Sequence, residues 1–210
     1  MDEVDGTFLI AGESLNLEAA LKRLARYPRQ TPPIYDLPGP GLPNVITIEE
    51  IRRTRRVSSR ISQVQGEWFV SAASSAPWVP IDADLRDADA GQTNGPYDAM
   101  VSLYNHFKSN APTGVNLAKI SKVLHLKRPN LFPILDSRLL RRYATAARRA
   151  AKAYPARHHK KMYWAAIRFD LINNSTALAA LRSQLSNHAE PEVRNLGGVT
   201  DLRLLDMLTW

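Results

Sequence analysis

The stretch 113–143 constrains the fold most, because it joins two helix-like segments through a corner rich in proline. Apolar residues recur at helical spacing over 117–127, which predicts an amphipathic helix. Pro129 and Pro133 then stop any helix, since proline lacks an amide hydrogen and restricts the residue before it. The stretch is therefore predicted to fold as a helix, a rigid corner and a second helix.

A single carboxylate, Asp136, stands where the corner ends, with Ser137 behind it. Either side chain can accept hydrogen bonds from the open amides of a following helix, which we expect over 137–154. An apolar stripe begins at Leu139, and six basic residues recur between its members. The spacing places most of these cations on one helix face; they are Arg138, Arg141, Arg142, Arg148, Arg149 and Lys152.

Helical spacing also dominates the rest of the chain. Further helices are predicted over 17–27, 47–61, 97–108, 162–172, 176–186 and 201–210, with caps at Asn16, Thr47, Asn174 or Ser175, and Thr200. Residues 66–80 favour helix or loop. We expect an all-α, single multi-helix globular domain over 45–210, preceded by residues 1–44, which hold a helix and an irregular Pro-rich connector over 28–44.

Composition narrows the class of protein. The chain has no cysteine, which excludes disulfides, thiolate metal sites and cysteine-ligated iron–sulfur clusters. His158 and His159 have no carboxylate close in sequence, so we expect no metal, and no motif points to a cofactor. No apolar run reaches the roughly 20 residues that span a bilayer, and the acidic start, residues 1–5, is a poor secretion signal. We therefore expect a cytoplasmic protein that does not associate with membranes.

Charge is segregated along the chain. Of the 28 Lys and Arg residues, fifteen lie between Lys108 and Arg168, together with one of the 20 acidic residues, Asp136. A basic segment of this kind attracts polyanions, nucleic acid first. The alternative is an ordinary solvated helix face. The sequence gives no oligomeric state.

Some residues are candidates for contacts with phosphate. Lys119 and Lys122 lie about one helical turn apart and could face one phosphate, and Lys160 and Lys161 follow the two histidines. Asp136 has two possible roles, which can coexist. It either caps the helix that follows, or it is a catalytic carboxylate that stabilises a developing cation or activates water.

The chain resembles a bacterial family described as domain of unknown function 6308. The resemblance rests on Lys127-Arg128-Pro129-Asn130-Leu131, Pro133-Ile134 and Asp136, preceded by Ser121-Lys122-Val123-Leu124, and on the ending Leu202-Arg203-Leu204-Leu205-Asp206 with Trp210. It extends from about residue 45 onward. The resemblance implies membership of a family without an assigned activity.

The segment from Gly114-Val115-Asn116 to Arg141 also resembles the helix-hairpin-helix DNA glycosylases, in which an aspartate at the position of Asp136 is catalytic. Asn116 replaces the second hairpin glycine. The position of the Schiff-base lysine of bifunctional members is Ala118, with Lys119 one residue later. The resemblance implies either a hydrolytic glycosylase that uses Asp136 alone, or a relative that only binds DNA.

Together these observations predict a helical protein that binds nucleic acid, duplex DNA in particular, through phosphates. Gly114 and Asn116 would belong to a hairpin whose amides hold one phosphate. Asp136 is the one candidate for chemistry, the excision of a flipped base. The alternative function is that of an accessory protein without enzymatic activity, whose basic face binds an acidic protein partner.

Overall fold

The structure is a computed structural model that describes residues 6–210. Residues 1–5, and with them the acidic start of the chain, lie outside the described part. The elements are, in order, β1 (Phe8–Ile10), β2 (Glu13–Leu15), α1 (Leu17–Ala25), α2 (Thr31–Tyr35), α3 (Ile48–Arg53), η1 (Thr54–Val57), α4 (Gln63–Ala73), η2 (Leu85–Asp87), α5 (Pro96–Ser109), α6 (Leu117–Lys127), α7 (Ser137–Arg142), α8 (Ala144–Ala153), η3 (Pro155–Arg157), α9 (Tyr163–Asn173), α10 (Ser175–Ser186), α11 (Pro191–Arg194), η4 (Asn195–Gly198) and α12 (Asp201–Leu208). The all-α prediction is confirmed, apart from the small β1–β2 hairpin.

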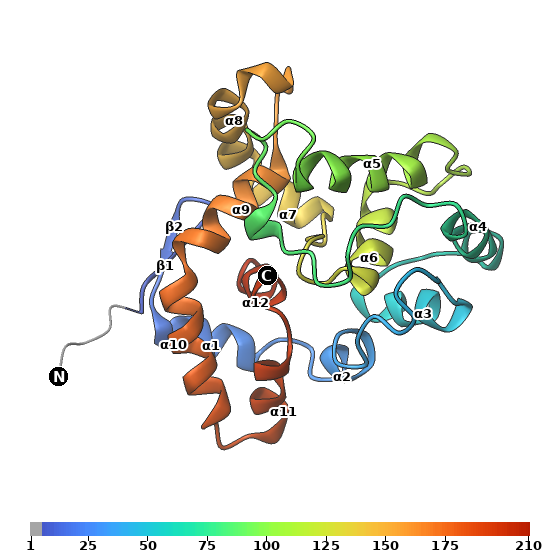
Figure 1. Cartoon of the computed structure of the whole chain (residues 1–210). Helices are drawn as coiled ribbons and strands as arrows, with labels where there is room; N and C mark the ends of the chain where they lie inside the picture. Colours follow the sequence, from blue (N-terminus) through green and yellow to red (C-terminus); the bar gives the residue numbers. More distant parts are fainter. Residues whose placement is uncertain (1–5) are drawn as a thin grey trace.

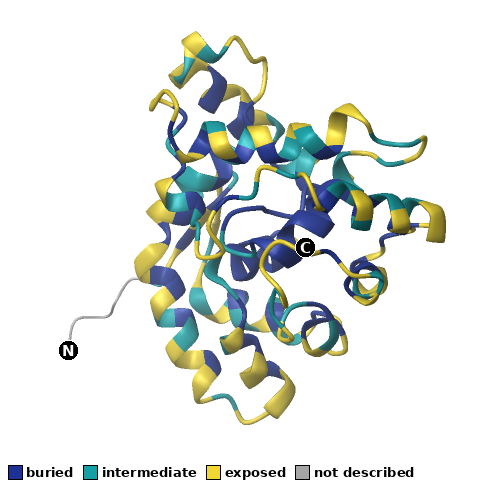
Figure 2. Cartoon of the chain, turned by 45° about the vertical axis from the view of Figure 1, so that its right-hand side comes forward, coloured by how far each residue is buried: buried dark blue, intermediate teal, exposed yellow. Residues whose placement is uncertain are grey.

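The last helix, α12, lies near the middle of the molecule, with α1, α9 and α10 on one side and α6 on the other (Figure 1). Residues 202–209 are all buried. Figure 2 shows the buried residues gathered around this centre and the exposed residues on the outer helices. A helix that is buried on every side is a core element, so α12 forms the centre of the core.

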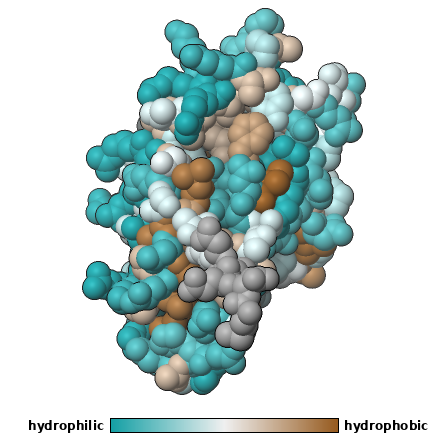
Figure 3. Space-filling view, turned by 90° about the vertical axis from the view of Figure 1, so that its left-hand side faces the viewer, coloured by the Kyte–Doolittle hydropathy of each residue, from teal (hydrophilic) through white to brown (hydrophobic). Residues whose placement is uncertain are grey.

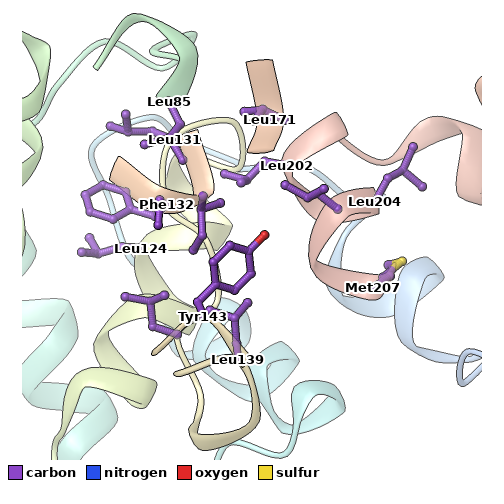
Figure 4. Packing of buried hydrophobic residues seen from close by; sticks show 14 of the residues in the cluster. Leu85, Leu124, Leu131, Phe132, Leu139, Tyr143, Leu171, Leu202, Leu204 and Met207 are labelled. Atoms are coloured by element: carbon purple, nitrogen blue, oxygen red, sulfur yellow. The ribbon is translucent and has the colours of Figure 1, made fainter. Parts of the chain in front are cut away.

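The main core packs α12 against the corner between α6 and α7. Tyr143 lies near Leu139 and Phe132, with Leu202 and Leu204 of α12 alongside (Figure 4). All five residues are almost completely buried. The corner that the sequence singled out is therefore held by the C-terminal helix.

Helix starts agree with the predicted caps except at α10, where neither Asn174 nor Ser175 provides the expected side-chain cap. The side chains of Asn16, Thr47 and Thr200 each accept a hydrogen bond from an amide in the first turn of the helix that follows, and Glu50 completes a capping box with Thr47. These starts are set by local chemistry, which the sequence displays directly.

Helix ends differ from prediction in two places. The helix expected over 137–154 is divided at Tyr143, whose backbone (φ −84°, ψ 2°) turns the chain between α7 and α8 and buries the tyrosine ring. The helix expected over 47–61 ends at Arg53 and continues as the 3₁₀ turn η1. In both cases side-chain burial in the core decides the direction of the backbone.

The N-terminal segment holds two elements that periodicity did not reveal. Ala11 and Gly12 both adopt positive φ, 55° and 89°, which forms the tight turn of the β1–β2 hairpin. The Pro-rich connector contains the short helix α2. Its prolines lie in the first turn, where proline is tolerated because the amide there has no partner within the helix. Phe8 and Leu24 belong to the main core, and the boundary expected between residues 44 and 45 stays a prediction.

Candidate functional site

Asp136 ends the corner and caps α7. Its Oδ1 accepts hydrogen bonds from the amides of Arg138 (3.0 Å) and Leu139 (2.9 Å), so the predicted cap is confirmed. The corner is fixed to α6 by the Leu135 amide, which donates to the Ser121 hydroxyl at 3.1 Å. Asp136 is partly exposed, and within residues 6–210 its Oδ2 has no hydrogen bond or ion pair. One carboxylate oxygen therefore holds the helix, and the charge of the carboxylate also acts on the ammonium group of Lys122.

The segment 113–116, which we call the hairpin that opens α6, lies on the surface. Gly114 is exposed and has φ +81°, a conformation that favours glycine. Asn116 is exposed and caps α6 by accepting from the Lys119 amide at 3.2 Å. Gln65 of α4 supports the turn, since its amide nitrogen donates to the Thr113 carbonyl (2.9 Å) and its oxygen accepts from the Lys119 ammonium (2.7 Å).

The helices α7 and α8 carry a group of cations that we call the α7–α8 basic face. Its members are Arg138, Arg141, Arg148, Arg149 and Lys152, all of them exposed. None of the five forms an ion pair within the described part of the chain. Arg142 differs, because its guanidinium pairs with Glu13 of the β1–β2 hairpin at 2.5 Å.

Lys160 and Lys161 follow η3 and are exposed. Lys161 lines a shallow groove of about 250 Å³ together with Lys108, and Leu117 and Leu135 lie in the same groove. Because Leu117 begins α6 and Leu135 precedes Asp136, the structure brings Lys161 to the same region as the hairpin and the corner.

Lys122 does not lie on this surface. It is 6% exposed, and burial lowers the pKa of its ammonium group. Lys127 is also internal and pairs with Glu50 at 2.7 Å. The buried guanidinium of Arg128 donates to the carbonyls of Val79 and Pro43. The charge count along the sequence therefore overestimates the cationic surface, and Lys122 is left out of the contacts proposed below.

A buried ionic network lies behind the corner. The Arg203 guanidinium of α12 donates to Asp36 Oδ1 (2.9 Å), to the Tyr27 hydroxyl (2.8 Å) and to Asp206. The ring of His125 lies beside it, with Nδ1 2.7 Å from the Phe132 carbonyl. Burial raises the pKa of Asp206 to about 6, although the charges of Arg203 and His125 act in the opposite direction.

Sequence reasoning missed this network, although one signal was present. Arg203 and Asp206 lie three residues apart among the leucines of α12. Opposite charges at this spacing inside an apolar helix indicate a buried pair. Asp36, its third member, comes from the Pro-rich connector and carries no such signal.

A small cavity of about 180 Å³ borders the network. Asp36, Arg53, His125 and Arg203 contribute to its lining, and Asp36 Oδ2 has no hydrogen-bond partner within residues 6–210. The volume suits water molecules bound to buried polar groups. We assign this cavity no ligand.

Two further properties concern metals and membranes. Residues 6–210 contain no group of three or more His, Asp or Glu side chains placed to hold a metal ion. No helix within this range has the length and apolar character needed to cross a bilayer. Figure 3 shows hydrophilic side chains over most of the face that carries the β1–β2 hairpin and α10, with small hydrophobic patches between them.

These features define an all-α protein in which a buried ionic network supports a surface corner flanked by cations. Residues 76–210 match the model of the Family of unknown function (DUF6308), and the chain belongs to this family. The match covers the corner and α12, which carry the residues that suggested the resemblance. No curated protein and no solved structure matches the chain. The glycosylase resemblance therefore rests on the residues between Gly114 and Arg141 alone.

Proposed function

We propose that this protein binds nucleic acid, duplex DNA first, through the α7–α8 basic face and the hairpin that opens α6. The observation that carries the proposal is that, within residues 6–210, none of the five exposed cations of this face forms an ion pair. Exposed arginines without ion pairs attract phosphates, which accept hydrogen bonds from guanidinium groups.

The hairpin adds neutral donors to this surface. Gly114 and Asn116 are exposed at the start of α6, where open amides and the helix dipole favour an anion. Lys119 lies in the first turn of α6, and Lys161 lines the same groove as Leu117 at the start of that helix, so both would add charge to this surface. Lys160 is exposed next to Lys161 and belongs to the same proposed surface.

Binding to a labelled DNA duplex at a series of salt concentrations tests the proposal. Five phosphate contacts predict a log–log slope of about −4.5. The double substitution R148Q/R149Q removes two of these contacts, so the slope should become shallower by about 2. R60Q is the matched control, because Arg60 is an exposed arginine between η1 and α4 and does not belong to the α7–α8 basic face.

Absence of duplex binding by the parent protein at low salt would refute the proposal. Binding to an acidic protein with no binding to duplex would favour the alternative, in which the basic face recognises a protein partner. The same R148Q/R149Q protein serves for both measurements.

A second candidate function, base excision, is favoured by Oδ2 of Asp136, which within residues 6–210 accepts no hydrogen bond. A carboxylate at the edge of a DNA-binding surface can stabilise the sugar cation that forms when a base leaves. In D136N the amide keeps an oxygen that caps α7, so the fold and DNA binding should persist while base release is lost. Release of a modified base from duplex DNA, measured for both proteins, tests this function; equal release by D136N would exclude Asp136 from the chemistry.

A further inference from the structure

A second basic hollow lies between α1, the start of α7 and the end of α12, with a volume of about 520 Å³. We call it the Trp210 cleft. Four cations and two aromatic rings contribute to its lining: Lys22, Arg23, Arg26, Arg138, Tyr27 and Trp210. Within the part of the chain that the structure describes, no acidic residue lines it.

Two of the four cations already have partners. Lys22 pairs with Glu18 on the exposed side of α1, and Arg23 donates to the Leu208 carbonyl at the end of α12. Arg26 and Arg138 form no ion pair with any residue in 6–210, and both are exposed. A hollow with two unpaired guanidinium groups attracts an anion, and phosphate suits their geometry.

The aromatic side of the cleft is held in place. The Arg138 guanidinium lies over the Trp210 ring, 5.1 Å from its centroid. Tyr27 meets the same ring edge-on, with centroids 5.9 Å apart and an angle of 76°. Trp210 nevertheless remains 38% exposed. An exposed indole beside arginines is a surface on which a planar base can stack.

We infer that the Trp210 cleft binds one unpaired nucleotide, with its phosphate on Arg26 and Arg138 and its base against Trp210. The volume of the cleft is that of a small-molecule site, whereas a double helix is too wide to enter it. Arg138 belongs to both the cleft and the α7–α8 basic face. The inference therefore deepens the proposed function and rests on it, because the cleft would take the single-stranded part of a nucleic acid bound on that face.

Two labelled probes test this inference, a blunt DNA duplex and the same duplex with a single-stranded thymidine extension. The parent protein should bind the extended probe more tightly. R26Q and W210L should each weaken binding of the extended probe by about tenfold, the contribution of a phosphate contact or one stacked base. Neither substitution should change the affinity for the blunt duplex. R60Q should bind both probes like the parent.

A separate measurement distinguishes a free nucleotide from a nucleotide within a strand. Quenching of tryptophan fluorescence by thymidine 5′-monophosphate in the parent, but not in R26Q, would assign free nucleotides to the cleft. Absence of quenching together with preference for the extended probe would assign a strand.

Equal binding of the two probes by R26Q, W210L and the parent would overturn the inference while leaving duplex binding intact. Failure of the parent to bind the blunt duplex would instead refute the proposed function. Because the Arg26 side chain is exposed and makes no hydrogen bond or ion pair within residues 6–210, R26Q should fold normally and keeps the inference falsifiable if W210L does not fold.

Discussion

At the residue scale, Arg203 shows how this chain uses charge inside its core. The side chain is 1% exposed and binds two carboxylates, Asp36 and Asp206. Its guanidinium also lies over the rings of Tyr27 and Tyr35. A guanidinium suits this position better than an ammonium group, because its planar fork serves several acceptors and stacks on aromatic faces. Removing it would leave two buried carboxylates without compensation.

Asp206 makes this network sensitive to pH. The charged groups around it include Arg203, His125, Lys122 and Asp136, and burial raises its pKa from 3.8 to about 6. Because the folded-state pKa lies above the unfolded value, the folded chain binds more protons between these two pH values. The free energy of unfolding should therefore fall as pH rises through this interval, by up to roughly 3 kcal/mol, and level off above it.

Urea unfolding of the parent and of D206N across this pH range measures the effect. The difference between the two free energies isolates Asp206, since the asparagine does not titrate. A difference that stays constant with pH would contradict the prediction.

At the element scale, the β1–β2 hairpin depends on a side chain from a distant helix. Asn174 joins α9 to α10, and its amide both accepts from the Leu9 amide (2.7 Å) and donates to the Leu9 carbonyl (2.9 Å). The sequence predicted Asn174 or Ser175 as a cap of α10. No side chain provides that cap, because the amide of Asn174 pairs with β1 as a neighbouring strand would.

The substitution N174A should release the hairpin. Loss of these buried hydrogen bonds should lower the free energy of unfolding by about 1–3 kcal/mol, and the Leu9 amide should exchange its hydrogen faster. N173A is the matched control, because Asn173 is exposed next to it in the chain. Hydrogen exchange followed by NMR gives the measurement; unchanged protection of Leu9 in N174A would show that the hairpin holds without this link.

At the scale of the whole molecule, the N-terminal segment completes the core, and the C-terminal helix α12 lies in the middle of that core. Tyr27 and Asp36 both belong to residues 1–44 and both bind Arg203 of α12. Phe8 packs into the same cluster as the residues of α12. The first and last parts of the chain therefore contribute to one network, although the sequence places the Pro-rich connector between them.

A chain reduced to residues 45–210 tests the expected boundary. Without Asp36 and Tyr27 the fragment leaves the Arg203 guanidinium short of partners, and it also exposes apolar surface of α12. We expect it to lose fixed tertiary packing, which near-ultraviolet circular dichroism measures. A fragment that unfolds cooperatively like the parent would instead confirm an independent helical domain over 45–210.

The sequence by itself determined the helical class and most helix starts, because these depend on contacts within a few residues. The side chains of Asn116, Asp136 and Thr200 accept hydrogen bonds from amides two or three residues later in the chain. The sequence is therefore enough to identify them as helix caps. The family resemblance likewise followed from residues in fixed order around the corner and the last helix.

Only the tertiary structure decided which charges serve the surface and which serve the interior. Lys119 and Lys122 look alike on one predicted helix, yet Lys119 remains partly exposed while Lys122 is covered. Periodicity assigns a residue to a helix face, but burial depends on how many other elements pack against that face. Those elements come from distant parts of the chain, and no local pattern records their approach.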